Sequence, residues 1–569
     1  MRVRNRKKSE RTLPRSTYQW RLFVLVVILL LIALGLIGRL INLTVINRQF
    51  LQNQGNARTI RRVTIPAHRG MILDRHGVPL AISTPVNAVW IDPADFKPSV
   101  SQLARLSTLL QVSKPLIQQQ CVHGRGKEFV YLKRGLNPSL ARQIKSLKIP
   151  GVFLQDEYHR YYPEGPVMAH GVGLTDVDGK GQEGLELAYN NWLEGQAGLK
   201  QVIKDRLGHV VADIRAIRPP KPGHDLQISL DKRIQYVAYR ELKAGVERYR
   251  ADSGSVVVLD VKTGEILAMV NWPSYNPNHR RSAQDGHARN RAVTDLFEPG
   301  STIKSFSMAS VLSNSQFTPS SQIDTSPGWM IIAGKRITDE RNNGVMDLTK
   351  ILQISSNMGM SKLILSQPAE NLWNTLHRVG FGQVTESNFP GERTGSLPHF
   401  KVWNPFVLAT LSFGYGISVT TLQLAQAYAV LAQGGVKVPV TFLKVEGDAP
   451  LGQRVMGQRI SREILAMLES VLSKGGTAPL ARVPGYRVTG KTGTVRIVGA
   501  HGYEKHHYNS IFIGIAPASQ PRLVVAVILH DPKGQFYYGG YTAGPIFSHV
   551  MSNTVHLLNI APDDVANLN

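Results

Sequence analysis

The chain has 569 residues, with 66 Lys and Arg against 40 Asp and Glu and a formal net charge of +26. No nucleic-acid motif and no interleaving of basic with aromatic residues accompanies this charge, which argues against a nucleic-acid partner; attraction to anionic lipid or an acidic polymer and an ordinary basic surface both remain open. The single cysteine, Cys121, excludes an internal disulfide, and a chain of this length buries adequate cores without one.

The first predicted element is a membrane helix. Residues 22–38 (LFVLVVILLLIALGLIG) form a run of seventeen uncharged residues, which lengthens if Arg39 reaches the membrane interface. Eight Lys and Arg against one Glu in residues 2–21 predict a cytoplasmic N-terminus and an exported remainder. A cleaved signal peptide is the alternative, but the run is long for one and RLINLTVINR offers no small-residue cleavage site. We therefore expect a basic tail at 1–21 and a single anchor at 22–43 in a bacterial inner membrane.

Residues 44–222 have signatures of their own. RGMILDRHGVPLA predicts a charged turn between short strands, and RYYPEG and GQEGLE follow as loops. Such segments favour buried pairs of opposite charge that fix domain packing, rather than chemistry. The candidates for these pairs are Arg69, Asp74, Arg75, Glu183 and Glu186. The proline-rich RPPKPGHD is typical of a domain boundary, so a second domain is expected at 223–560, with a tail at 561–569.

The second domain mixes helical and strand patterns. A strand and a helix (LQISLDKRIQYVAYRELKAGV) precede a two-stranded hairpin at 256–270, and mostly helical sequence fills 297–435. Strands return in VTGKTGTVRI, SIFIGIAP and RLVVAVIL, and a last helix begins near Pro545. The order predicts a domain that combines α-helices with β-strands.

Ser301 and Lys304, in FEPGSTIKSF, are the first candidates for chemistry. A helix that starts there would place both on one face. A serine is a poor nucleophile until a neighbouring base takes its proton, and a lysine serves as that base only if burial lowers its pKa. The pattern alone is weak, because Ser229-Leu230-Asp231-Lys232 has the same form where a predicted strand runs into a helix.

Two further motifs follow. Ser355-Ser356-Asn357 interrupts predicted helix, where it can relay a proton and hold a substrate amide, or simply cap a helix. Lys491-Thr492-Gly493-Thr494 lies on a predicted strand, where glycine lets a substrate approach the backbone and lysine and threonine suit an anion. Each motif has a second copy elsewhere in the chain, here called a decoy. Ser274-Tyr275-Asn276 repeats the S-x-N form in a predicted turn, and Lys262-Thr263-Gly264 repeats the K-T-G form in the hairpin.

Only the motifs at 301, 355 and 491 occur in the order S-x-x-K, S-x-N, K-T-G with room for a helical subdomain between them. That is the motif set of penicillin-binding proteins and serine β-lactamases. With SGSVVVLDVKTGEILAMVNWPSYNPN, RNRAVTDLFEPGSTIKS, GERTGSLP and SFGYGISVTTLQLA, the chain resembles a class B penicillin-binding protein, closest to the septal (division-specific) DD-transpeptidase.

The resemblance implies an α+β fold: an antiparallel sheet with helices on both faces and an all-helical insert, standing on an N-terminal pedestal of the dimerisation type at 44–222. Four positions depart from residues common in the family and suggest a diverged or duplicated copy, although none removes a catalytic group. They are Ser305, Ile354, Thr421 and Val495.

By the same resemblance, the enzyme would cross-link peptidoglycan stem peptides through a serine acyl-enzyme during septal wall synthesis, and β-lactams would acylate that serine. The catalytic residues would be Ser301 as nucleophile, Lys304 as base, Ser355 and Lys491 in proton transfer to the leaving amine and Asn357 on the peptide amide, and the substrate-binding residues would be Thr492, Gly493 and Thr494. The backbone N–H groups of Ser301 and Thr494 would form the oxyanion hole. No metal or cofactor is expected, and a division-type lipid-II polymerase and other divisome proteins are the expected partners at the membrane.

Two other functions agree less well with the sequence. A β-lactamase needs a second base for deacylation, and Glu370 faintly resembles one but lies in a predicted surface helix. A penicillin-binding sensor would carry further spans or a cytoplasmic domain, and a silent scaffold would have lost a motif residue.

HGYEKHHYNS places His501, His506 and His507 after the KTG strand, on a hairpin expected to border the cleft. No thiol or carboxylate cluster accompanies them, so a solvated turn is favoured over a metal site. Tuning of substrate capture by their protonation between about pH 5 and 7 is the alternative.

Overall fold

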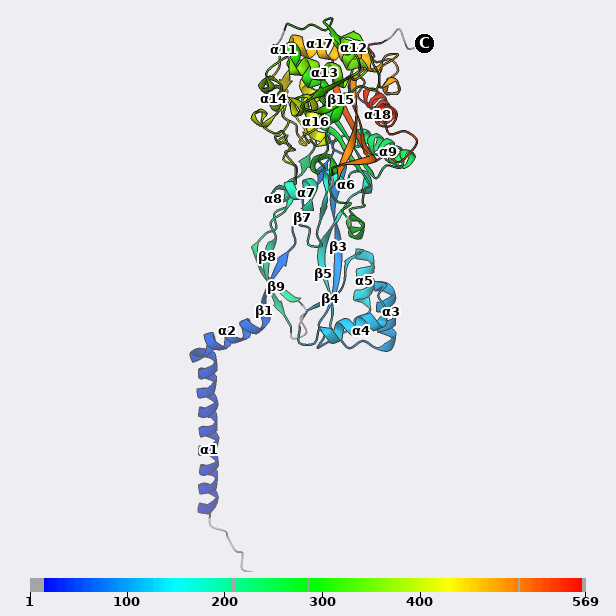
Figure 1. Ribbon diagram of the computed structural model, residues 1–569. Helices are drawn as coiled ribbons and strands as arrows, with labels where there is room; N and C mark the ends of the chain where they lie inside the picture. Colours follow the sequence, from blue (N-terminus) through cyan, green and yellow to red (C-terminus); the bar gives the residue numbers. More distant parts are fainter. Residues whose placement is uncertain are drawn as a thin grey trace, which may run out of the picture.

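The computed structural model describes residues 15–127, 129–205, 210–284, 286–314, 316–499 and 502–564. Figure 1 shows an elongated molecule, with a long helix at one end, a narrow middle part and a globular domain at the other end. The last labelled helix, α18 (Ala543–Leu557), lies in the globular domain.

The long helix α1 (Arg15–Ile41) continues through a π-helical turn, Asn42–Ile46, and is followed by α2 (Arg48–Thr59). Within it, Gln19–Ile46 form 28 residues that are long and apolar enough to cross a membrane, and none of their most apolar window is buried in the protein. The predicted anchor at 22–43 lies inside this segment, so the expectation of one apolar N-terminal helix is confirmed.

The pedestal is built on two sheets. The strands of the first, in spatial order, are β1 (Ile60–Ile65), β8 (Gly198–Lys204) and β9 (Val210–Arg218). The strands of the second are β10 (Leu226–Gln227), β2 (Ile72–Leu73), β3 (Pro79–Ile91) and β4 (Val130–Leu136), with β5 (Val152–Tyr161) also paired to β3. Strand β10 follows the proline-rich connector and pairs with β2 of the pedestal. The second pedestal sheet therefore includes two residues of the predicted second domain.

Helices cover the lower part of the pedestal, and a small unit joins it to the globular domain (Figure 1). The covering helices are α3 (Val100–Leu110), α4 (Lys114–His123) and α5 (Pro138–Ser146). The joining unit contains α6 (Ala169–Val172), β6 (Leu174–Thr175), β7 (Gly181–Glu183), α7 (Gly184–Ala188) and α8 (Asn190–Leu193). Cys121 is half-buried in the apolar cluster of the lower part.

The predicted packing pairs are found in part. Arg69 and Arg160 both pair with Glu186, at 2.7 and 2.6 Å, in a buried triad, and Arg75 pairs with Glu265 at 3.4 Å. Asp74 instead accepts backbone N–H groups within its own turn. For Glu183 the prediction is wrong among the described residues, since none of them forms an ion pair with it.

The globular domain is centred on a five-stranded antiparallel sheet. Its strands, in spatial order, are β12 (Ile266–Trp272), β11 (Ser253–Asp260), β21 (Leu523–His530), β20 (Gly502–Ala516) and β19 (Thr489–Gly499). Helices α9 (Lys232–Tyr249) and α18 (Ala543–Leu557) pack on one face and α16 (Thr421–Ala432) on the other. Every residue of β11 is buried, as expected for a central strand covered on both faces.

The subdomain between β12 and β19 is mainly helical, but it is not all-helical. Its principal helices are α10 (Arg291–Thr294), α11 (Lys304–Asn314), α12 (Leu348–Gln353), α13 (Asn357–Leu365), α14 (Ala369–Arg378), α15 (Pro405–Leu411) and α17 (Gln458–Glu469). Its short strand pairs are β13 (Gln322–Asp324) with β16 (Val345–Asp347), β14 (Trp329–Ile332) with β15 (Lys335–Thr338), and β17 (Val436–Lys437) with β18 (Gln453–Arg454). The first two pairs lie within the stretch for which helix was predicted.

Candidate active site

Ser301 and Lys304 lie at the start of α11, where the predicted helix begins as a 3₁₀ turn, Gly300–Ile303. Side chains three residues apart eclipse in such a turn, so the two residues share a face. Gly300 has φ +52°, and a Cβ there would lie 2.2 Å from the Val495 side chain on β19. Glycine is therefore required for the nucleophile turn to pack against the strand.

Lys304 is the centre of a buried hydrogen-bond network. Its Nζ donates to the Ser355 carbonyl oxygen at 2.5 Å, to Asn357 Oδ1 at 2.7 Å and to Ser355 Oγ at 3.2 Å. Burial lowers the pKa of Lys304 to about 7, although the nearby Asp339 carboxylate acts in the opposite direction. The Phe413 ring, with its centroid 5.9 Å from the amine, is part of the apolar wall that excludes water. An amine with this pKa is available as a base near neutral pH.

The Ser355-Ser356-Asn357 motif forms the turn between α12 and α13. Ser355 has φ +63°, a strained value for a residue other than glycine, and its carbonyl is held by Lys304. Asp339, just after β15, fixes the other side of the turn: its carboxylate accepts Asn357 N at 2.6 Å and Ser356 Oγ at 2.5 Å. The motif is thus both a helix cap, through Ser356, and part of the network at Lys304.

Lys491 enters the same network from the edge strand β19. Its side chain is fully buried, and Nζ lies 3.0 Å from Ser355 Oγ. Burial lowers the pKa of Lys491 well below its usual value, and the positive charge of Lys304 lowers it further. Thr492 Oγ1 lies 3.4 Å from the same amine and 2.8 Å from Thr477 Oγ1. One hydroxyl, that of Ser355, therefore connects both lysines.

Gly493 and Thr494 complete the strand motif. A Cβ at Gly493 would lie 3.0 Å from the Pro299 carbonyl oxygen and 3.2 Å from the Thr302 methyl group, so the glycine lets β19 approach the nucleophile turn. Thr494 Oγ1 accepts the Gly539 N–H at 3.0 Å. These contacts give Gly493 a packing role that the sequence did not indicate.

The structure thus joins Lys304, Ser355, Asn357, Lys491 and Thr492 in one continuous network. The hydroxyl of Ser301 stays outside it, because that hydroxyl forms no hydrogen bond with any described residue. It follows that the hydroxyl is free to turn toward an incoming carbonyl carbon.

The decoy motifs lie elsewhere and are structural. Ser229 Oγ donates to the Ile266 carbonyl in the core, Lys262-Thr263-Gly264 forms the turn between β11 and β12, and Ser274 Oγ donates to the Pro166 carbonyl. Glu370 is exposed in the first turn of α14, where the sequence placed it on a surface helix.

Ser305, one of the four residues that differ from those common in the family, also has a structural role. Its hydroxyl lies 2.8 Å from the Tyr428 hydroxyl, which donates to the Thr302 carbonyl at 2.8 Å. The pair ties the nucleophile turn to α16 on the sheet.

Of the hairpin histidines, His501 lies outside the described residues. His507 Nδ1 lies 2.8 Å from Asp531 Oδ2, and this carboxylate raises the pKa of His507. His506 adopts φ +67° in the bulged part of β20. Among the described residues, no group of three or more His, Cys, Asp or Glu could hold a metal ion.

Two side chains near the network were missed by the sequence analysis. Asp339, in the polar run TDERNN, carries no pattern that distinguishes it from a surface loop residue. Phe413 follows α15 as one more apolar residue of a helical stretch. Only their positions in space show that one holds the SSN turn and the other shields the amine.

Two family models match the chain: the penicillin binding protein transpeptidase domain over residues 254–552 and the penicillin-binding protein dimerisation domain over residues 64–228. The chain belongs to the class B penicillin-binding proteins. The first model spans the central sheet and all three motifs, and the second spans the pedestal up to β10. The fold and family expected from the motifs are thereby confirmed.

Similar proteins match over nearly the whole chain. A probable peptidoglycan D,D-transpeptidase, PbpC, of Pseudomonas aeruginosa is 42% identical over 95% of this chain and 96% of its own. The peptidoglycan D,D-transpeptidase FtsI of Escherichia coli K12 is 41% identical over 96% of this chain and 93% of its own. The structure of penicillin-binding protein 3 from Mycobacterium tuberculosis, complexed with aztreonam, matches with a TM-score of 0.68 and 27% identity over 88% of this chain and 98% of that one.

Proposed function

We propose that this protein is a peptidoglycan D,D-transpeptidase that cross-links stem peptides through an acyl-enzyme on Ser301. The observation that carries the proposal is the buried network that joins Lys304, Ser355 and Lys491, with Lys304 one 3₁₀ turn after Ser301. The names of the relatives, which include D,D-transpeptidases from two genera, support the same reaction.

In the acylation step, the amine of Lys304 takes the proton of the Ser301 hydroxyl as its oxygen attacks the carbonyl of the penultimate D-Ala. Lys304 must first give up one of its hydrogen bonds to the SSN turn, which is consistent with the looser geometry of catalytic groups in ligand-free enzymes. The oxyanion that forms would be stabilised by the backbone N–H groups of Ser301 and Thr494.

Collapse of the tetrahedral intermediate breaks the peptide bond, and the leaving D-Ala amine needs a proton. Ser355 supports this transfer, because its hydroxyl lies 3.2 Å from Lys304 and 3.0 Å from Lys491. The proton taken from Ser301 can return through this hydroxyl, so the enzyme is left with an ester and a neutral base. An amine of a second stem peptide then attacks the ester, forms the cross-link and returns the proton to Ser301.

The remaining motif residues would hold the donor peptide. Asn357 would bind the acylated peptide's amide, and Thr492 and Thr494 would bind the terminal carboxylate on the exposed edge of β19. Gly493 would keep the strand close to the nucleophile turn. A β-lactam carries a carboxylate beside its reactive amide and would acylate the same serine.

The decisive experiment is labelling of the purified full-length protein with a fluorescent penicillin. We expect a stable adduct on the wild type and none on Ser301→Ala. Ser229→Ala is the matched control, because it alters the second S-x-x-K pattern of the chain and should retain the adduct. Equal labelling of Ser301→Ala would refute the assignment, and rapid loss of the adduct would favour a β-lactamase instead.

The position in the cell is also part of the proposal. The basic segment before α1 supports a cytoplasmic N-terminus, with the pedestal and catalytic domain on the periplasmic side of the inner membrane. The similarity to FtsI supports a role in septal wall synthesis, with a division-type lipid-II polymerase and other divisome proteins as partners. Protease treatment of spheroplasts, which should degrade everything after the membrane helix, tests the orientation.

A further inference from the structure

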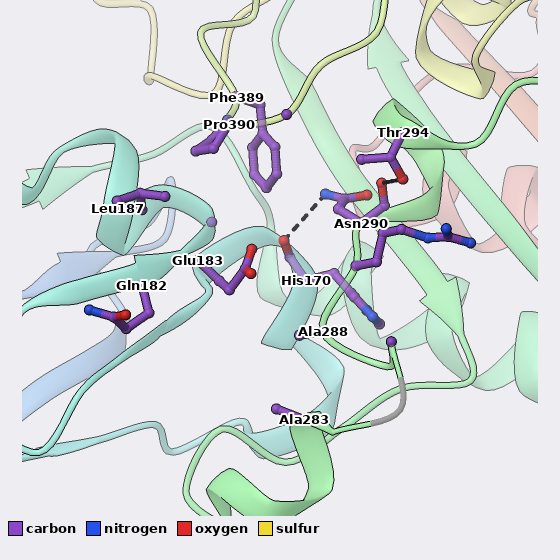
Figure 2. A pocket seen from close by; sticks show the side chains of 14 residues that line it. His170, Gln182, Glu183, Leu187, Ala283, Ala288, Asn290, Thr294, Phe389 and Pro390 are labelled. Atoms are coloured by element: carbon purple, nitrogen blue, oxygen red, sulfur yellow. Dashed lines mark hydrogen bonds between the residues drawn. The ribbon is translucent and has the colours of Figure 1, made fainter.

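A large and a small cavity lie in the seam between the pedestal and the catalytic domain. The large one, of about 490 Å³, lies around Phe389 and Asn290 (Figure 2). Its polar side chains are either exposed, as Glu183 is, or bonded within the protein, as Asn290 is to the His170 carbonyl at 3.2 Å. No side chain that lines this cavity is both buried and without a partner, so it gives no sign of a ligand.

The small cavity, of about 30 Å³, lies at the end of β5. The pedestal contributes β5 and the chain just after β6, and the catalytic domain contributes Pro277, Asn278 and Arg280. Asn278 joins the two domains there, because its Nδ2 donates to the Tyr162 carbonyl at 2.8 Å and its Oδ1 accepts the Tyr162 N–H at 2.9 Å. The cavity is thus part of a closed junction, and no residue of the network at Ser301 lines it.

Arg160 brings a buried donor without a partner to this cavity. The residue is only 6% exposed. Its Nε donates to Glu186 Oε1 at 2.6 Å, and its Nη1 donates to the Gly70 carbonyl at 2.8 Å and to Ser83 Oγ at 3.1 Å. Its Nη2 is buried as well, yet no described residue accepts a hydrogen bond from it. These N–H groups lose water on folding without gaining an acceptor, a cost that a ligand can remove.

The buried charges around Arg160 do not cancel. Arg69 and Arg160 share a single carboxylate, that of Glu186, so two guanidinium groups face one negative charge, and no member of the triad is more than 6% exposed. All three side-chain nitrogens of Arg69 have acceptors, which leaves the excess positive charge at Arg160. A buried charge without a counter-charge is costly, so the site favours an anion over a neutral partner.

The solvent side of the cavity adds further positive charge. Arg280 and His159 line it and are exposed, and no described residue forms an ion pair with Arg280. The carboxylate that lines the cavity belongs to Asp176, which accepts the N–H groups of Asp178 and Lys180 within its own turn, both at 2.9 Å. The cavity therefore brings together a guanidinium group from each domain, while its carboxylate is bonded to its own loop.

We propose that this small cavity binds a halide ion such as chloride, with Arg160 Nη2 as the buried donor and Arg280 closing the site from the catalytic domain. A water molecule would accept the N–H but leave the charge, whereas an anion answers both. A space of about 30 Å³ suits one small ion rather than a larger ligand. The ion would connect a guanidinium of the pedestal to one of the catalytic domain and so stiffen their junction. The proposal does not depend on the reaction at Ser301.

The first test is thermal unfolding of the full-length protein in detergent, with sodium chloride replacing sodium gluconate at constant ionic strength. An ion that binds only the folded state raises the unfolding midpoint, and we expect a rise of about 2–4 °C. Arg280→Gln should lose at least about half of this rise, because it removes one of the two charges on the ion. Arg281→Gln is the matched control: it removes the same charge from the next residue, which is exposed and does not line the cavity, and should keep the rise.

The second test locates the ion. Crystals of the full-length protein grown in sodium bromide should show an anomalous scattering peak beside Arg160 Nη2. Bromide peaks at other positions alone would mean an adventitious ion only and would overturn the proposal, as would equal midpoints in chloride and gluconate. Phosphate at the same ionic strength should give no rise, and a rise equal to that in chloride would overturn the assignment to a halide. Penicillin labelling of Ser301 in Arg280→Gln should match that of the wild type, so failure here and failure of the transpeptidase assignment are distinguishable.

Discussion

The pKa of about 7 at Lys304 makes a quantitative prediction for the pH dependence of acylation. A base must be neutral to accept the Ser301 proton, so the second-order rate constant for penicillin should follow the neutral fraction of the amine. That fraction is about one tenth at pH 6 and about nine tenths at pH 8. We therefore expect a rise of about tenfold between these values and a plateau above pH 8.

A solvent-exposed lysine gives a different curve. With its usual pKa near 10.4, less than about 1% of the amine would be neutral at pH 8, and the rate would still rise tenfold per pH unit. The difference of about 3.5 units corresponds to about 5 kcal/mol of unfavourable burial of the ammonium form. The plateau thus measures whether burial of Lys304 governs its basicity.

The assay is stopped-flow acylation by a fluorescent penicillin from pH 5.5 to 9.5 at constant ionic strength. His507 is the principal confounding group, because Asp531 raises its pKa above the usual 6.5. His507→Gln is therefore the control, made alone and together with His506→Gln, and should keep the rise near pH 7. A rise that disappears in these variants would transfer the pH dependence to the hairpin, and a rate still climbing tenfold per unit above pH 8 would refute the argument from burial.

Three substitutions test the supports of the site and the pedestal. Asp339→Asn keeps a carbonyl acceptor for the SSN turn but removes the charge that raises the pKa of Lys304. The rise in the same acylation assay should therefore move about 0.5–1 unit to lower pH. A rise at an unchanged pH would contradict this role of Asp339. Gly300→Ala should lower penicillin labelling at least about tenfold, because its Cβ meets Val495; adding Val495→Ala should restore part of it, and labelling at the wild-type level in the single variant would contradict the packing. Glu186→Gln leaves two buried guanidinium groups without a counter-charge and should lower the free energy of unfolding by about 3–5 kcal/mol. Calorimetry should show this loss as a lower unfolding midpoint of the pedestal. An unchanged midpoint would show that the triad adds no stability.

How far the sequence predicts this protein depends on the range of the interactions. Local patterns place Ser301 and Lys304 on one face, because three residues of spacing suffice. Lys304 also meets Ser355, some fifty residues away, and Lys491 reaches the same hydroxyl from a distant strand. These two contacts follow from the family's motif order and not from any local pattern. The contacts of Asp339 depend on the path of a polar loop, which periodicity does not describe.

The same limit applies to the pedestal. Charged residues in RGMILDRHG and GQEGLE suggested buried pairs, and Glu186 forms two of them. Glu183, three residues earlier and of the same type, forms none among the described residues. Composition gives the capacity to pair, whereas the position of each side chain in the fold decides which carboxylate meets a guanidinium and which stays exposed to solvent.

The two active-site amines share one hydroxyl, and this sharing has a consequence for when the base is formed. Burial and then the charge of Lys304 lower the pKa of Lys491, so the two lysines titrate as a coupled pair. A substrate carboxylate bound at Thr492 would bring negative charge to Lys491, raise its pKa and draw the proton away from Lys304. The base would then become neutral in response to the substrate.

The rate constant at saturating penicillin reports the bound enzyme, whereas the second-order constant reports the free enzyme. If the carboxylate moves the proton to Lys491, the rise of the saturated rate should lie about one unit below that of the second-order constant. Both constants come from the same stopped-flow traces over a range of penicillin concentrations. Coincident curves would mean that the bound carboxylate does not change the pKa of Lys304, and burial alone would then set its basicity.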